Sequence, residues 1–155
     1  MPHPAPQPTP AALRAAIVKE ARSLVGIREV PMGSNSGTDV HRIQSATHAY
    51  NAPWCVSTVQ YIWQKVLGST WAEDTANAYF LASYAKESGR VVEKPVPCCA
   101  VVYRIGAGHA GTVVELAGGG TFQAVEGNEA DAVREVLRDP RSIGCTFILR
   151  PELHG

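Results

Sequence analysis

The spacing of hydrophobic positions changes near the middle of this chain. Up to about residue 90, apolar side chains recur every three or four residues, which is typical of a helix with one buried face. Beyond that point, short runs rich in Val, Ile, Phe and Thr are separated by glycine and polar turns, which is typical of strands. Helices followed by strands predict an α+β fold with an antiparallel sheet.

Four helices are expected in the first part of the chain. Thr9 followed by Pro10 is a helix-start signal, and Thr38 is expected to cap the second helix. Gly26 and Gly68 follow apolar-periodic segments and are expected to end the first and third helices. The expected helices cover, approximately, residues 10–25, 39–46, 54–67 and 76–86.

Five strands are expected in the second part, and the third helix is expected to pack against a sheet of five or six strands. The segment AGGG at 117–120 is a turn signal between the second and third of these strands. The expected strands cover residues 100–105, 111–116, 121–126, 132–138 and 146–150.

Length and charge limit the classes of function. The 155 residues fit one domain, expected at 10–155, and the proline-interrupted residues 1–9 are expected to form a flexible tail. Formal net charge is zero, with no run of basic residues, so nucleic-acid binding is not expected. No apolar stretch approaches the ~20 residues of a membrane span, so membrane insertion is not expected. Nothing in the sequence requires more than a monomer.

Cysteine content and the start of the chain bear on the cellular compartment. Four cysteines are too few for a disulfide framework in a chain of this length, so reduced thiols are expected. The first residues lack a basic segment followed by an apolar one, so no Sec signal is expected. Synthesis in a cytoplasm is therefore the expectation.

Three short segments carry candidate chemistry: PWCV at 53–56, GHAG at 108–111 and EGN at 126–128. Cys55 lies at a predicted helix start, where unpaired N–H groups favour a thiolate and can hold an oxyanion. His109 would take the thiol proton and return it to the leaving amine. Glu126 would orient the imidazole, and Asn128 would share that role or support the site. Together, the segments predict a cysteine hydrolase.

Each segment also has a simpler interpretation. Cys55 alone would be a buried structural thiol, His109 a surface histidine in a glycine turn, and EGN a plain turn. Glu129 and Asp131 are expected to be solvated.

The remaining cysteines are expected to be buried thiols. Cys98 and Cys99 begin the first expected strand, and Cys145 begins the last. A zinc site formed by Cys98, His109 and Cys145 is a minor alternative, because the spacing matches no zinc motif. No metal or cofactor is expected.

The order of the three segments resembles the CHAP family, the cysteine- and histidine-dependent amidohydrolases/peptidases within the papain-like, NlpC/P60-like class. The resemblance covers about residues 12–153 and includes GIRE at 26–29 and GSNSG at 33–37. It implies N-terminal helices packed on an antiparallel sheet and a peptidoglycan hydrolase without a cofactor. It also implies that Cys55 is the nucleophile and His109 the base, with Glu126 orienting His109 and Asn128 in support.

The resemblance further implies bacterial peptidoglycan as the partner, reached through a holin-type pore, a phage particle or a secretion machine. Ser34 and Asn35 would lie near the cleft, and Trp54 and Gly108 would contact substrate. Many relatives carry Gly-Asp where this chain has Cys98-Cys99. Some carry an Asp-rich calcium loop that is missing here, so no metal site is predicted.

Several functions remain open at this point. An N-acetylmuramoyl-L-alanine amidase and a stem or cross-bridge endopeptidase would use the same triad, in phage lysis or phage entry. Another thiol chemistry on the same fold is a further possibility. The remaining alternatives are a non-catalytic phage structural or wall-binding module and an antibacterial amidase toxin delivered into a competing bacterium.

Overall fold

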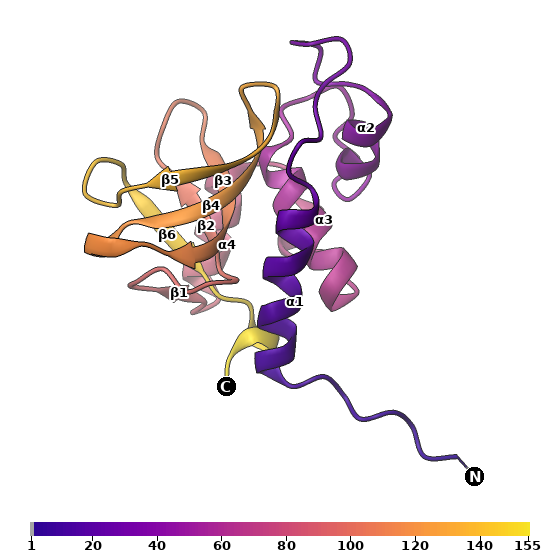
Figure 1. Cartoon of the computed structure of the whole chain (residues 1–155), viewed down its shortest axis with the longest axis vertical. Coiled ribbons are helices and arrows are strands. Elements are labelled where there is room, and N and C mark those ends of the chain that lie inside the picture. The colour runs from indigo at the N-terminus through magenta and orange to yellow at the C-terminus, as the bar shows by residue number, and fades with distance from the viewer. Residues whose placement is uncertain (1) are drawn as a thin grey trace.

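The computed structural model describes residues 2–155, and within them it contains four α-helices and one six-stranded sheet (Figure 1). This confirms the α+β class. The helices are α1 (Pro10–Ser23), α2 (Thr38–Gln44), α3 (Cys55–Leu67) and α4 (Ala78–Glu87). The strands are β1 (Val91–Val92), β2 (Ala100–Tyr103), β3 (His109–Leu116), β4 (Phe122–Glu129), β5 (Ala132–Arg138) and β6 (Cys145–Ile148).

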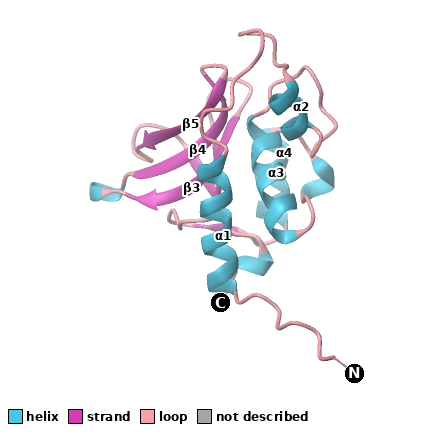
Figure 2. Cartoon of the chain, turned by 45° about the vertical axis from the view of Figure 1, so that its right-hand side comes forward, coloured by secondary structure: helices cyan, strands magenta, loops and turns pink. Residues whose placement is uncertain are grey.

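The strands follow the order β1-β6-β2-β3-β4-β5, and every neighbouring pair is antiparallel. Figure 2 shows the sheet on one side of the molecule and the helices on the other. Helix α3 packs on β3 and β4, α1 packs on α3 and β3, and α4 packs on β2. The apolar core fills the space between these layers. The N-terminal end of α3 is thereby held beside β3 and β4, the strands that carry the other candidate residues.

Local signals account for most helix ends. Thr9 Oγ1 accepts the N–H of Ala12 at 3.1 Å, and Gly68 ends α3 with φ 84°. The second helix differs from the prediction. Thr38 lies inside α2 instead of capping it, and the preceding Gly37 has φ 122° and offers no side-chain cap.

Strand β5 has its predicted bounds, whereas β4 extends three residues beyond its predicted end at Glu126. The extension contains a β-bulge. Glu126 pairs with Arg134 and Glu129 pairs with Ala132, so β4 advances three residues where β5 advances two. A bulge of this kind bends the strand and redirects the side chains that follow it.

The C-terminal end of the chain lies beside the first turn of α1, and the segment before α1 extends away from it (Figure 2). The Arg14 guanidinium donates hydrogen bonds to the carbonyl oxygens of Leu153 at 2.9 Å and Gly155 at 3.0 Å. Residues 2–9 contain no helix or strand, and residue 1 of the predicted tail lies outside the described residues. Among residues 2–155, no helix has both the length and the apolar character needed to cross a membrane.

Candidate active site

Cys55 is the first residue of α3, and Trp54 is the residue that precedes the helix. The Trp54 ring is fully buried, and its indole N–H donates to Glu29 Oε2 at 2.9 Å. The backbone carbonyl of Trp54 accepts from the backbone N–H of Thr58 at 3.0 Å, which closes the first helical turn. A buried, hydrogen-bonded Trp54 therefore fixes the point at which the thiol enters the helix. Cys55 itself is 7% exposed.

A buried polar network ties this helix start to the loop at 31–37. Glu29 accepts the backbone N–H of Asn35 at 2.9 Å on its second carboxylate oxygen. The buried Gln44 amide donates to the carbonyl oxygens of Asn35 and Ala52, both at 2.9 Å. Asn35 thus joins the network through its backbone, while the Ser34 hydroxyl contacts Pro31 O and Ser36 Oγ within the same loop.

The position of Trp54 corrects one expectation from the sequence. A ring with no exposed surface cannot contact substrate, so Trp54 supports the site from beneath it. Its burial follows from packing against β4, because Gly127 brings that strand within contact distance of the ring. A Cβ at Gly127 would lie 3.1 Å from Trp54 Cε3 and would overlap Thr58 Oγ1.

Two further glycines of the motifs have comparable packing roles. A Cβ at Gly111 would lie 2.7 Å from Glu126 Cγ, so Gly111 leaves room for that side chain. Gly108 has φ 100°, and a Cβ there would lie 2.8 Å from Ala78 Cβ at the start of α4. Gly108 therefore shapes the turn before His109, next to α4.

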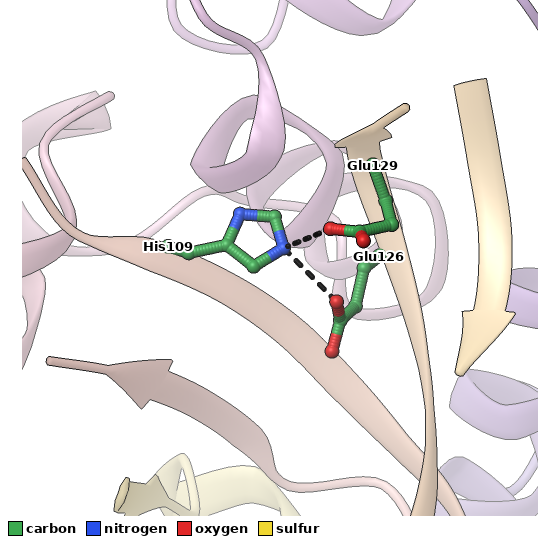
Figure 3. A group of neighbouring side chains, drawn as sticks. All are labelled: His109, Glu126 and Glu129. Atoms are coloured by element: carbon green, nitrogen blue, oxygen red, sulfur yellow. Dashed lines mark hydrogen bonds and ion pairs between the residues drawn. The ribbon is translucent and has the colours of Figure 1, made fainter. Parts of the chain in front are cut away.

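His109 is the first residue of β3 and pairs with Tyr103 on β2. Its Nε2 lies 2.9 Å from Glu126 Oε1 and 3.3 Å from Glu129 Oε2 (Figure 3). The Tyr103 ring stacks on the imidazole, with centroids 5.7 Å apart and 23° between the planes. In Figure 3 the other ring nitrogen, Nδ1, points away from both carboxylates. Nδ1 is therefore the nitrogen left to interact with the thiol.

Glu126 is fully buried, and Arg138 on β5 forms a bidentate ion pair with its carboxylate. Nε of Arg138 donates to Oε2 at 3.0 Å, and Nη2 donates to Oε1 at 2.5 Å. Burial alone would raise the pKa of Glu126, but hydrogen bonds from His109 and Arg138 outweigh it and lower the pKa. The buried carboxyl is therefore ionised at neutral pH.

The charge state of His109 follows from its neighbours. Burial alone would lower its pKa, but the neighbouring Cys55 and Glu126 side chains outweigh burial and raise the pKa to about 9. The imidazole is thus protonated at neutral pH, between a thiol and an ionised carboxylate.

Sequence reasoning missed two residues of this cluster, Glu129 and Arg138. Glu129 was expected to be solvated, yet it contacts His109 because the bulge in β4 redirects it. Asn128 occupies the bulge with φ 58°, and within residues 2–155 its side chain makes no hydrogen bond to His109. The Gly127-Asn128 pair inside a strand pattern is the signal that could have indicated a bulge.

The same cluster has the donor atoms for a metal ion, since those of His109, Glu126 and Glu129 lie within 4.8 Å of one another. Arg138 argues against a cation there. Its Nη2 contacts carboxylates of both Glu126 and Glu129, at 2.5 and 3.5 Å, so a positive charge already occupies the space between them. Within residues 2–155 this is the one group of three such donors, so Cys98 and Cys145 do not join His109.

Of the three other thiols, Cys98 and Cys99 are buried as expected, whereas Cys145 is only partly buried. Burial raises the pKa of Cys98 and of Cys145 to about 11, and that of Cys99 to about 12. Cys98 has φ 96°, in the region that favours glycine.

Comparisons with known proteins add no assignment. A scan against protein-family models found no matching family, and searches of curated proteins and of solved structures found no similar protein.

Proposed function

We propose that this protein is a papain-like cysteine hydrolase of the CHAP type that cleaves amide bonds of bacterial peptidoglycan. The observation that carries the proposal is the placement of His109. One of its ring nitrogens lies 2.9 Å from the buried Glu126 carboxylate, and Cys55 at the start of α3 is one of the neighbours that raise the pKa of the imidazole. A nucleophile, a base and an orienting carboxylate placed as neighbours are the parts of a thiol triad.

The chemistry follows from these contacts. The Cys55 thiolate attacks the amide carbonyl carbon, and backbone N–H groups at the start of α3 stabilise the oxyanion. The His109 imidazolium donates its Nδ1 proton to the leaving nitrogen as the C–N bond breaks, which leaves an acyl-enzyme. Water then attacks the thioester and gives a proton to His109. The C–S bond then breaks and the acid product leaves. The thiolate–imidazolium pair of Cys55 and His109 is thereby restored.

Peptidoglycan as the substrate rests on the sequence resemblance, which spans nearly the whole chain. The amide could be the glycan–alanine bond of an amidase or a stem or cross-bridge bond of an endopeptidase, and both fit the same triad. Reaching the wall would require a holin-type pore, a phage particle or a secretion machine. A role in phage lysis or phage entry is consistent with each of the first two routes.

Digestion of purified peptidoglycan tests the proposal. Wild type, Cys55→Ala and the matched control Cys145→Ser would be compared, with the products identified by mass spectrometry. New amine and carboxylate ends from wild type and Cys145→Ser, but not from Cys55→Ala, would support it, and the fragment masses would name the bond. Equal digestion by a folded Cys55→Ala variant would rule out the thiol mechanism. No digestion by any form would point to a non-catalytic module or another substrate.

A further inference from the structure

We propose that Arg138 and Glu129 are positioning residues for His109, with Arg138 holding two carboxylates at one ring nitrogen. This inference rests on the proposed function, because it concerns how the base of that triad is oriented. It adds a second carboxylate and a guanidinium to the side chains that determine the protonation of His109.

The contacts of Arg138 fix its side chain on two sides. It binds both oxygens of Glu126 and also lies 3.5 Å from Glu129 Oε2. Its guanidinium stacks over the Tyr103 ring at 4.9 Å, and that ring stacks on His109. A planar guanidinium held by a carboxylate and an aromatic ring has little freedom to move. A lysine ammonium cannot make the same bidentate and stacking contacts.

The titratable groups around His109 explain why a cation is needed beside its two carboxylates. Cys55 faces His109 from α3, Glu126 and Glu129 face it from β4, and Tyr103 faces it from β2. Arg138 on β5 contacts the two carboxylates. Nε2 carries at most one proton, and two carboxylates that share it repel each other. Arg138 contacts both carboxylates and offsets that repulsion, so both stay aimed at the ring.

The two carboxylates have different surroundings. Glu126 is fully buried and clamped by Arg138, whereas the Glu129 side chain is 35% exposed and its contact with Nε2 is longer. Glu126 is therefore the main acceptor of the Nε2 proton. Glu129, at the rim, adds negative charge beside the ring and steadies the imidazolium.

The expected effects on His109 have opposite signs. Arg138→Met removes a cation near the imidazolium, so the pKa of His109 should rise and the alkaline limb of the pH profile should move up. The loss of the clamp should also lower the rate of Cys55 alkylation roughly ten- to a hundredfold. Glu129→Gln removes an anion, so the pKa of His109 and the alkaline limb should move down. Arg138→Lys keeps the charge and should hold the pKa near wild type, with partial loss of rate.

The experiment is a pair of titrations on the full chain. The first measures the pKa of His109 by NMR, and the second measures Cys55 alkylation by iodoacetamide against pH. Arg141→Met and Glu115→Gln serve as matched controls, because both residues are exposed and lie outside the His109 cluster. Unchanged His109 pKa values in Arg138→Met and Glu129→Gln, with only stability lowered, would overturn the proposal. If Arg138→Met fails to fold, Glu129→Gln alone decides through its downward shift.

Neither titration uses peptidoglycan, so the two proposals can fail separately. If the pKa of His109 shifts in opposite directions in Arg138→Met and Glu129→Gln but the wild type digests no peptidoglycan, the positioning roles stand and the proposed substrate is wrong. If the wild type digests peptidoglycan but neither variant shifts the pKa of His109, the proposed function stands and the positioning roles are wrong.

Discussion

The four cysteines of this chain lie either at the beginning of a strand or at the beginning of a helix, and the contrast shows which surroundings favour a reactive thiol. Cys98, Cys99 and Cys145 lie at the beginnings of strands, where burial raises the pKa of each thiol. Cys55 is also buried, but it begins a helix and is one of the neighbours that raise the pKa of the His109 imidazole. Burial by itself makes a thiol inert, so the reactivity that we propose for Cys55 depends on the helix start and on His109.

The two surroundings also differ in what maintains them. Cys98 and Cys99 pack in the apolar core, and Cys99 Sγ accepts a long hydrogen bond of 3.4 Å from Val96 N–H. The Cys55 position depends on buried polar contacts: Trp54 to Glu29 beneath it and His109 to Glu126 across from it. Polar networks of this type lose more when one member is removed, because the partner is left buried and unpaired.

The largest expected effect is that of Cys55→Ala. It removes the nucleophile, so hydrolysis should fall by at least about 10³-fold, while the fold, which needs no polar contact from the thiol, should persist. Initial rates on peptidoglycan and thermal unfolding would be measured together. Cys99→Ala, which deletes a strand thiol, should keep its rate within a few-fold in the folded fraction. A similar loss of rate in both variants would erase the contrast between the two surroundings.

Gly127→Ala should be the most disruptive change next to the helix start. Its Cβ would overlap Thr58 Oγ1 and lie 2.8 Å from Thr58 Cβ, so β4 and α3 must separate. We expect a loss of about 3 kcal/mol in the free energy of unfolding, together with slower alkylation of Cys55. Urea unfolding would measure the first quantity. Gly118→Ala is the control, since nothing lies within 4 Å of its Cβ, and equal losses in the two variants would contradict the packing argument.

Trp54→Phe tests the polar support beneath Cys55. It keeps an aromatic ring but leaves Glu29 Oε2 without its donor in a buried position, so unfolding should become about 2 kcal/mol easier. Trp71→Phe is the matched control, because within residues 2–155 its indole N–H donates no hydrogen bond. If both variants lose the same stability, the Glu29 contact has no special weight.

The pH profile sharpens the comparison further. His109 must be protonated to donate a proton to the leaving nitrogen, and the pKa of His109 is raised to about 9. The rate should therefore hold up to about pH 9 and then fall, approaching tenfold per further pH unit as imidazolium is lost. Values of kcat/KM between pH 6 and 10 would show the limb. A limb near the ordinary histidine value of about 6.5 would mean that Cys55 and Glu126 do not act on this ring.

Local signals accounted for much of this fold and for part of the site. The Thr9 cap, the Gly68 end and the placement of Cys55 at a helix start depend on a few neighbouring residues, and the sequence predicted all three. Contact between His109 and Glu126 was also predicted, because a hairpin links their strands. The start of α2 and the two-residue strand β1 left too short a pattern to be predicted correctly.

Glu129 and Arg138 could not be predicted in the same way. The contact of Glu129 with His109 depends on a single extra residue in β4, which shifts its pairing with β5. Regular alternation instead selects Asn128, two residues after Glu126, as the partner. Arg138 reaches Glu126 from twelve residues away along the chain, across a pairing that only the folded sheet defines. Strand register and the partner that a long side chain reaches both depend on the tertiary structure. This part of the site could therefore be found only from the structure.

The most direct test is the alkylation rate of each cysteine in one protein sample. Wild type and His109→Ala would be treated with limiting iodoacetamide at neutral pH, and labelled peptides would be quantified by mass spectrometry. We predict that Cys55 in wild type reacts at least about tenfold faster than Cys98, Cys99 and Cys145, and that His109→Ala removes the difference. Equal rates for all four thiols in folded wild type, or a fast Cys55 that ignores the loss of His109, would contradict the account.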